Sequence, residues 1–369
     1  MQHRELGDSG VEVSEVGFGA WVVGTDWWGD RDEDDALDMV EYALDQGITY
    51  FDTGDVYGHG RSEELLGEVL AERGDEMTVA TKVGYDFYNN PQAGHGELPK
   101  EMDAEYLRDA VEGSLDRLGV DSVDYLQLHN PDVAEFTPDV LELLDELRED
   151  GRADAIGVAL GPSIGWLAEG EFAIEEEFDA VQYVGNILEQ DVHQHFVEKI
   201  REEDASTSLI PRVPHSSGLL NEQVTPETEL GEGDHRGFRP DEWYETGWEK
   251  IEELRFLERA ERSSAEGSSG DKPRERDGER TMGQASLQWL LSFDEVATVT
   301  PTFRSKDDID EWAAAPETPA LSDEEQARVA DLYETNFGID RFDGMEKEDY
   351  RTSVDGDDLR DAGLIGSAD

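Results

Sequence analysis

Short apolar runs alternate with amphipathic stretches along most of the chain. The apolar runs have the length and composition of buried strands, which are predicted at 15–19, 48–52, 77–83, 123–129, 153–159, 180–186, 207–213 and 296–302. Between them apolar residues recur at helical spacing, which predicts helices at 32–46, 61–73, 103–118, 137–150, 162–170, 193–203, 281–292 and 305–314. Alternation of strand and helix eight times over is typical of an α/β protein with a (β/α)8 TIM barrel.

Four segments lie outside this alternation. Residues 2–14 contain two extended pieces around a Gly-Asp-Ser-Gly turn, which predicts an N-terminal β-hairpin at the lower end of the barrel. A long insertion follows the seventh strand, at about 218–280. It contains an acidic part rich in Gly and Pro, a helix-like part at 241–262, and a polar Gly/Ser linker at 263–280 that we expect to be mobile.

The C-terminal part begins with a capped helix. Ser322 followed by Glu325 is a capping-box pattern and predicts a helix at 322–335, after which the chain is acidic and mostly aperiodic. We therefore expect one barrel domain at 1–336 and an acidic C-terminal extension at 337–369.

The charge is strongly negative: 92 Asp and Glu stand against 30 Lys and Arg, a formal net charge of -62. Such self-repulsion destabilises a compact chain unless salt screens it, so we interpret the sequence as that of a halophilic protein with an acidic surface. Disorder is excluded, because 37% of the residues are hydrophobic and lie in periodic blocks. Nucleic acid and anionic membranes would be repelled, so neither is an expected partner.

The chain contains no cysteine, which excludes disulfides, thiolate metal sites and a cysteine nucleophile. Its N-terminus is polar, and no apolar stretch approaches the ~18 residues of a membrane span. The expected location is the cytoplasm.

Polar residues lie at or just after the carboxyl ends of three predicted strands: Asp52 and Tyr57 after one, Lys82 after the next, and His129 after the third. In a parallel barrel these ends face one cavity, so the four side chains are expected to converge. A tyrosine hydroxyl normally ionises near pH ~10, and a neighbouring ammonium lowers that value. With Asp52 holding Lys82 charged and His129 bonding a substrate oxygen, Tyr57 is predicted to protonate an oxygen as it becomes an alkoxide.

Each member has an ordinary alternative role: Asp52 as a helix cap, Lys82 and Tyr57 as surface residues, His129 as a core histidine. The coincidence of polar groups at three strand ends favours catalysis, because strand-end residues of this fold are typically catalytic.

The chain resembles the aldo-keto reductases from about residue 3 to about residue 315. The segments that carry the resemblance are RELG at 4–7, GFGAW at 17–21, FDTGDVYG at 51–58, SEELLG at 62–67, ATKVG at 80–84, YLQLHNPD at 125–132, RVPHSSGLL at 212–220 and QASLQWLL at 284–291. The resemblance implies reduction of a small-molecule carbonyl substrate by NADPH, with Tyr57 as the acid, Lys82 and Asp52 tuning it, and His129 orienting the carbonyl.

The same resemblance implies a cofactor site across the mouth of the barrel. Gln182 would bind the nicotinamide amide, the 212–220 loop would wrap the pyrophosphate, and Arg304 would meet the adenosine phosphate. The implied cofactor-binding residues are Gly19, Trp21, Gln182, Pro214, Ser216, Gly218, Leu219, Thr302, Arg304 and Asp308. Trp21, with Trp27 and Trp28, would also form apolar walls of a substrate pocket.

Several positions depart from the family pattern around the cofactor. Ala159 and Leu160 replace the Ser-Asn pair that usually holds the carboxamide, and Gly185 replaces an aromatic residue. Thr302 stands where Gly is usual. Trp312 replaces an Asn, and is predicted either to stack on adenine or to pack in a helix groove.

Other kinds of site are less consistent with the sequence. The glycines at 17, 19 and 24 lack the spacing of a dinucleotide fingerprint and precede a Trp-rich loop. His193 and His195 are two residues apart, the wrong spacing for one helix face, so no metal site is predicted. The remaining alternative is a nucleotide-binding regulatory or scaffold protein with weak or no turnover, motivated by the altered nicotinamide positions.

Overall fold

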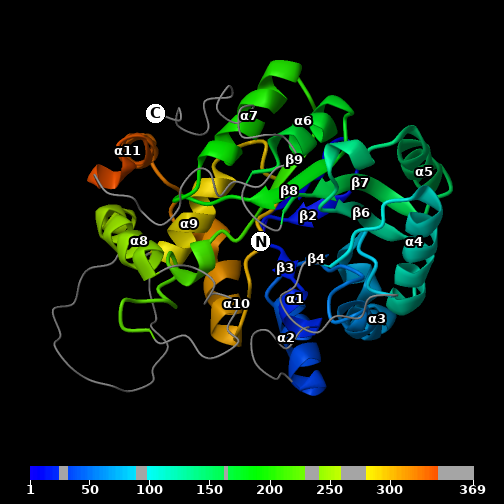
Figure 1. Ribbon diagram of the computed structural model, residues 1–369. Helices are drawn as coiled ribbons and strands as arrows, with labels where there is room; N and C mark the ends of the chain where they lie inside the picture. Colours follow the sequence, from blue (N-terminus) through cyan, green and yellow to red (C-terminus); the bar gives the residue numbers. More distant parts are fainter. Residues whose placement is uncertain (25–31, 89–97, 162–164, 229–240, 259–279, 340–369) are drawn as a thin grey trace.

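The structure, a computed structural model, describes residues 1–24, 32–88, 98–161, 165–228, 241–258 and 280–339 (Figure 1). The strands are β1 (His3–Glu5), β2 (Glu12–Ser14), β3 (Phe18–Gly19), β4 (Tyr50–Asp52), β5 (Thr78–Val83), β6 (Val123–His129), β7 (Ala153–Ala159), β8 (Ala180–Val184) and β9 (Ser208–Arg212). The α-helices are α1 (Trp21–Gly24), α2 (Glu33–Asp45), α3 (Arg61–Arg73), α4 (Ala104–Leu118), α5 (Pro138–Glu149), α6 (Leu167–Glu175), α7 (Asp191–Glu203), α8 (Asp241–Leu254), α9 (Met282–Leu291), α10 (Lys306–Ala313) and α11 (Asp323–Glu334).

The central sheet is parallel and follows chain order from β3 to β9. It closes through residues 296–300, which bridge β9 at Leu209 and Arg212 and bridge the first strand region at Val16. Helices surround the sheet (Figure 1). The predicted (β/α)8 barrel is therefore confirmed.

The closing strand is less regular than predicted. The segment 296–302 pairs only at isolated positions, and the first strand shortens to Phe18–Gly19 with a bridge at Val16. Pro301 has no N–H to donate, so the ladder cannot continue through it.

The inside of the barrel is a separate apolar cluster, sealed by the N-terminal hairpin of β1 and β2. Its members are Leu6, Val11, Val13, Tyr50, Ala80, Tyr125, Ala155, Ala180, Ile210 and Ala297. Gly157 belongs between them because a Cβ there would lie 2.1 Å from the Tyr125 hydroxyl, which donates to the Ala180 carbonyl at 3.1 Å. The expected hairpin is confirmed.

The alternation of side chains along the strands determines which residues form the next interior layer, on the carboxyl-end side of this cluster. Two residues after an interior position a side chain again points inward. The inward residues one step beyond the cluster are Asp52, Lys82, Gln127, Gln182 and Arg212. The barrel thus changes from apolar to polar toward the carboxyl ends of its strands.

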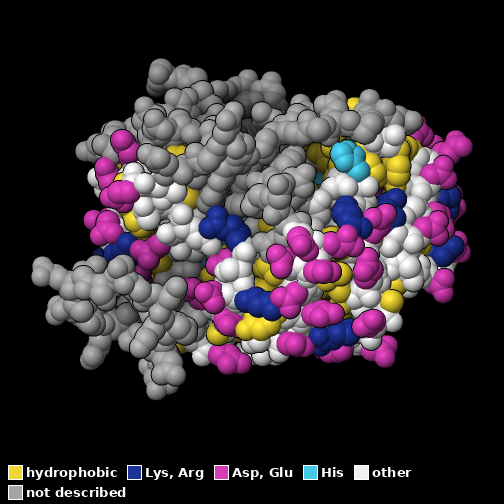
Figure 2. All heavy atoms as spheres, turned by 90° about the horizontal axis from the view of Figure 1, so that it is seen from below, with side chains coloured by type: hydrophobic (Ala, Val, Ile, Leu, Met, Phe, Trp, Pro, Cys, Tyr) yellow, Lys and Arg dark blue, Asp and Glu magenta, His cyan; other side chains and the backbone are white. Residues whose placement is uncertain are grey.

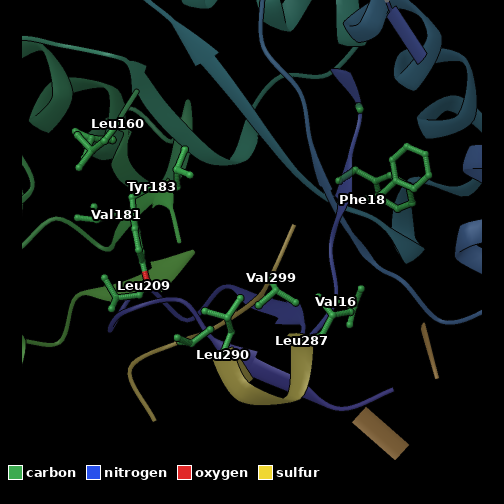
Figure 3. Packing of buried hydrophobic residues seen from close by; sticks show 14 of the residues in the cluster. Val16, Phe18, Leu160, Val181, Tyr183, Leu209, Leu287, Leu290 and Val299 are labelled. Atoms are coloured by element: carbon green, nitrogen blue, oxygen red, sulfur yellow. The ribbon is translucent and has the colours of Figure 1, made fainter. Parts of the chain in front are cut away.

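A second core lies between the sheet and its helices. Figure 3 shows Val16 and Val299, from the two strand regions that meet at the closure, near Leu287 and Leu290 of α9. These side chains are fully buried. Burial of apolar surface therefore stabilises the closure where regular strand pairing is sparse.

Some helix boundaries differ from the prediction. The helix expected at 162–170 is α6, which begins only at Leu167, because Gly165 and Trp166 have positive φ and residues with positive φ do not continue a helix. The helix expected at 241–262 ends at Leu254 and is followed by a 3-10 turn at Arg255–Leu257. The predicted capping box of Ser322 and Glu325 is present.

Three predicted features involve segments outside the described residues. They are Trp27 and Trp28, most of the 263–280 linker, and the C-terminal extension beyond residue 339.

Candidate active site

Adjacent strands place the four predicted catalytic residues together. Asp52 and His129 end β4 and β6, and Lys82 lies next to the end of β5. Asp52 is in register with Ala80, and Lys82, two residues beyond Ala80, is in register with Gln127. Tyr57 comes from the turn after β4, where its N–H donates to the Gly54 carbonyl. The predicted convergence of Asp52, Tyr57 and Lys82 is seen in their contacts.

Lys82 and Asp52 form a buried ion pair. The Lys82 Nζ lies 2.7 Å from Asp52 Oδ2 and also donates to the Thr53 carbonyl at 2.6 Å, and the lysine is 0% exposed. Burial alone lowers the pKa of Lys82, but the charge of Asp52 and the contact with Tyr57 outweigh it and raise this pKa above its ordinary value. The ammonium is therefore kept charged.

Asp52 accepts hydrogen bonds on both oxygens. In addition to Lys82 on Oδ2, its Oδ1 accepts from Gln127 Nε2 at 2.8 Å and Gln182 Nε2 at 3.0 Å. A buried ion pair repays its desolvation only when its remaining hydrogen-bonding groups are satisfied. The two glutamines provide this for the carboxylate.

The hydroxyl of Tyr57 is the third partner of the ammonium. Lys82 Nζ donates to Tyr57 Oη at 3.2 Å and lies 4.7 Å from the centroid of the ring. Tyr57 is partly exposed, whereas Lys82 and Asp52 are buried. A phenol whose oxygen accepts a hydrogen bond from a fixed ammonium is a suitable proton donor to a ligand in the mouth of the barrel.

His129 lies against the rings of two tyrosines. Its ring is 5.7 Å from that of Tyr57 and 4.8 Å from that of Tyr85, edge to face in both cases. Burial, reinforced by the charges of Lys82 and Arg212, holds the pKa of His129 well below its usual range. The imidazole is therefore neutral near pH 7 and has one N–H to donate.

The residue predicted to hold the nicotinamide amide has another partner. Gln182 is 1% exposed and donates its amide N–H to Asp52. Ala159, the last residue of β7, is in register with Gln182, and Leu160 comes next in the chain. Both residues are buried and apolar. This side of the mouth has fewer polar side chains than the resemblance implies.

The predicted pyrophosphate loop follows β9. Pro214 accepts a hydrogen bond from Ser286. Gly218 ends a 3-10 turn that begins at Ser216, Leu219 follows this turn, and both are buried. The hydroxyl oxygen of Ser216 is also buried, and none of the described residues hydrogen-bonds to it. A phosphate oxygen would satisfy that hydroxyl, so the loop fits an anionic cofactor.

The predicted adenosine-phosphate segment begins α10. Thr302 and Arg304 are partly exposed, the Arg304 N–H donates to Asp308 Oδ2 at 2.8 Å, and Ser305 caps the helix by accepting from the Asp308 N–H. Burial raises the pKa of Asp308, although hydrogen bonds from Arg304 and Ser305 oppose the shift. A helix start beside an arginine suits a phosphate monoester.

The first loop region and Trp312 complete the predicted cofactor set. Gly19 ends β3, where a Cβ would lie 3.3 Å from the Pro301 carbonyl, and Trp21 begins α1 with a partly exposed side chain. Trp312 is 1% exposed and packs against His215 and Phe303. It therefore packs in the core, and the adenine-stacking alternative does not fit.

The sequence did not single out Gln127 or Tyr85, and it marked Arg212 only as the first residue of the loop 212–220. Gln127 and Arg212 are inward by alternation from Tyr125 and Ile210, so the period of two was the available signal. Tyr85 lies beyond its strand, and no sequence pattern indicates its contact with His129.

His193 and His195 point to different partners. His193 is buried and hydrogen-bonds Tyr183, whereas His195 contacts Glu171 at 2.8 Å. Among the described residues no group of three or more His, Cys, Asp or Glu could hold a metal ion. Within the same residues, every helix is too short or too polar to cross a membrane.

Comparisons with known proteins agree with this geometry. The chain matches the aldo/keto reductase family over residues 15–334. It is 30% identical over 250 residues to the aldo-keto reductase YhdN of Bacillus subtilis, covering 65% of this chain and 70% of that one. It is 28% identical over 237 residues to the NADH-specific methylglyoxal reductase of Escherichia coli, covering 61% and 71%. The holo form of aldo-keto reductase AKR11C1 from Bacillus halodurans superposes with a TM-score of 0.69 at 27% identity, covering 90% and 96%.

Proposed function

The chain belongs to the aldo/keto reductase family, and we propose that it reduces the carbonyl group of an aldehyde or ketone with NADPH, using Tyr57 as the general acid. The observation that carries the proposal is the hydrogen bond from the buried Lys82 ammonium to the Tyr57 hydroxyl, with Asp52 behind it. A nucleotide-binding protein without turnover has no need of a tyrosine supported in this way.

The four side chains divide the work. His129, neutral near pH 7, donates its N–H to the substrate carbonyl oxygen and orients it. When bound, the cofactor supplies the hydride to the carbonyl carbon. Tyr57 gives its proton to the oxygen as that oxygen gains negative charge, and Lys82 stabilises the phenolate that remains. Asp52 keeps Lys82 charged and in place.

The cofactor residues are proposed on the same basis. Ser216 would hold the pyrophosphate together with the loop 212–220, whose first residue, Arg212, turns into the barrel. Arg304 with the start of α10 would hold the adenosine phosphate. The methylglyoxal reductase of Escherichia coli, a relative, is NADH-specific. The proposed contact of Arg304 with the adenosine phosphate is therefore the first part of this proposal to test.

The test of the proton donor is Tyr57→Phe. NADPH oxidation is followed with a panel of aldehydes and ketones in molar KCl, and NADPH affinity is measured separately by fluorescence. Turnover should fall by roughly 10²-fold or more, the scale of general acid catalysis, while cofactor affinity is kept. Tyr42→Phe removes a hydroxyl bonded to Asp310 outside the barrel and should leave turnover unchanged. Undiminished turnover in Tyr57→Phe would remove this residue from the mechanism.

A regulatory or scaffold role is the second candidate. Apolar Ala159 and Leu160, together with Gln182 bonded to Asp52, leave few groups to hold a nicotinamide amide. This role predicts tight NADPH binding without turnover of any member of the substrate panel.

We also propose a cytoplasmic, high-salt setting. Figure 2 shows Asp and Glu side chains outnumbering Lys and Arg on the face it displays, in keeping with the net charge of -62. Molar KCl shortens the Debye length to about 3 Å and screens this repulsion, so Tm should rise from low salt to molar KCl. A flat Tm would contradict the halophilic interpretation.

A further inference from the structure

Arg212 ends β9 on the inner side of the barrel mouth. It pairs with Val184 of β8 and bridges Thr300 of the closing segment, and Ile210, two residues earlier, belongs to the barrel interior. Strand alternation therefore turns Arg212 inward, in the layer that contains Lys82 and Gln182.

The guanidinium is held in place by backbone. Its Nη2 donates to the Leu160 carbonyl at 2.7 Å. Gly161 leaves the space that the group occupies, because a Cβ at that residue would lie 1.9 Å from Nη2. The side chain is thus fixed across the β7 end before any ligand arrives.

This cation has no carboxylate partner among the described residues. Its Nε is buried without a hydrogen bond, and Leu160 is the only described residue to which the guanidinium donates. Arg4, Arg117 and Arg280, in contrast, each form an ion pair with a glutamate. Arg212 is partly buried, and a charge withdrawn from water is costly unless it is paired, while arginine stays protonated in proteins. The unused donors therefore favour an anion.

The catalytic groups lie close to this cation. After burial, the charges of Lys82 and Arg212 help to lower the pKa of His129. Asn130, whose amide N–H donates to Tyr85 Oη at 2.6 Å, has its Oδ1 3.4 Å from the position of a Cβ on Gly161. Arg212 and Asn130 thus both lie beside Gly161, and Asn130 connects through Tyr85 to His129, whose ring lies against that of Tyr57.

We propose that Arg212 binds a carboxylate of the substrate, so that the preferred substrates are oxo acids rather than neutral carbonyl compounds. This inference rests on the proposed reductase function. A guanidinium presents two parallel N–H groups that match a carboxylate, and burial strengthens such a pair. A phosphate of the cofactor offers the same chemistry, and the experiment separates the two sources.

The experiment compares ω-oxo acids of two to five carbons with alkanals of the same lengths, using wild type, Arg212→Met and Arg212→Lys. At its optimal length, the oxo acid should exceed its matched alkanal in kcat/KM by at least about tenfold in wild type. Arg212→Met should abolish this preference, mainly by raising KM for the oxo acid. Arg212→Lys, which retains the charge, should restore part of it. Arg201→Met removes a surface arginine paired with Glu295 and should keep the preference.

Two binding measurements separate the outcomes. NADPH affinity, measured by fluorescence, should be equal in wild type and Arg212→Met; a selective loss would assign Arg212 to a cofactor phosphate and overturn the proposal. Succinate should bind wild type calorimetrically, and about tenfold or more weakly to Arg212→Met, whether or not any substrate is turned over. Equal effects of Arg212→Met on acids and alkanals, or no succinate binding to wild type, would also overturn it. Succinate binding without turnover would refute only the reductase function.

Discussion

The two sides of the barrel mouth, here called its walls, differ in whether their buried or partly buried cation has a carboxylate partner. On the β4 to β6 side, Lys82 is paired with Asp52, and the carboxylate is further bonded by two glutamines. On the β7 to β9 side, Ala159 and Leu160 are apolar, and Arg212 has no carboxylate partner among the described residues. With Gln182 contributed by β8, the ion pair of the first wall has its hydrogen bonds completed and can hold a proton donor without a ligand. The second wall leaves N–H donors of Arg212 available to a ligand.

The comparison predicts that substitutions in the first wall reduce stability, whereas those in the second reduce binding. Lys82→Met should lower the free energy of unfolding by about 3–5 kcal/mol, because it leaves the buried Asp52 carboxylate without its cation. Urea denaturation in molar KCl measures this loss. The double variant Lys82→Met, Asp52→Asn should recover much of it, since removing both charges of a buried pair is often nearly neutral. A loss below about 1 kcal/mol would mean that the pair is not buried as described.

The next effect concerns the outer part of the cofactor site. Wild type should prefer NADPH to NADH by roughly ten- to hundredfold, the scale of one charge-assisted contact of ~1.5–3 kcal/mol, and Arg304→Ala should sharply reduce that ratio. The kcat/KM values for both cofactors give the measurement. Arg201→Ala, which removes the exposed pair with Glu295, is the control. Equal kcat/KM values in wild type, or an unchanged ratio in Arg304→Ala, would make Arg304 a surface arginine.

Two buried histidines, His193 on α7 and His215 in the loop after β9, should give a smaller, pH-dependent effect on stability. Burial lowers the pKa of His193 to about 3 and that of His215 to about 4, against an ordinary value of 6.5. Below pH ~6.5 each histidine is protonated in the unfolded chain but stays neutral in the folded chain. Each of them therefore lowers the stability of the fold as pH falls toward its folded-state pKa. His193→Gln should reduce the slope by up to about 1.4 kcal/mol per pH unit between pH 4 and 6. An unchanged slope in urea titrations would show that His193 accepts a proton in the fold.

The smallest effect is expected on the outer surface. Arg201 contacts Glu295 at 2.5 and 3.1 Å, but its side chain is 58% exposed. Arg201→Ala should cost no more than about 1 kcal/mol at low salt and less in molar KCl, because exposed pairs are screened. A cost that persists in molar KCl would place this surface pair in the same class as Lys82 and Asp52.

Local patterns explain which elements were predictable. The apolar period located the strands of the barrel, and the Ser322 and Glu325 pattern identified a capping box that the structure contains. The helix expected at 162–170 was placed too early, because positive φ at Gly165 and Trp166 delays its start. The strand expected at 296–302 pairs at isolated positions, since regular pairing depends on both neighbours and on the missing N–H of Pro301.

By itself, the sequence determined the order of the strands, the polar residues at their ends and the excess of acid, because each follows from local spacing or composition. Only the tertiary structure decided which polar groups meet. Gln182 bonds Asp52 across 130 residues, Trp312 is enclosed by His215 and Phe303, and Arg212 faces the mouth beside Leu160. Pairing, burial and the resulting pKa shifts depend on distances through space, and closure of the barrel sets those distances between residues far apart in the chain.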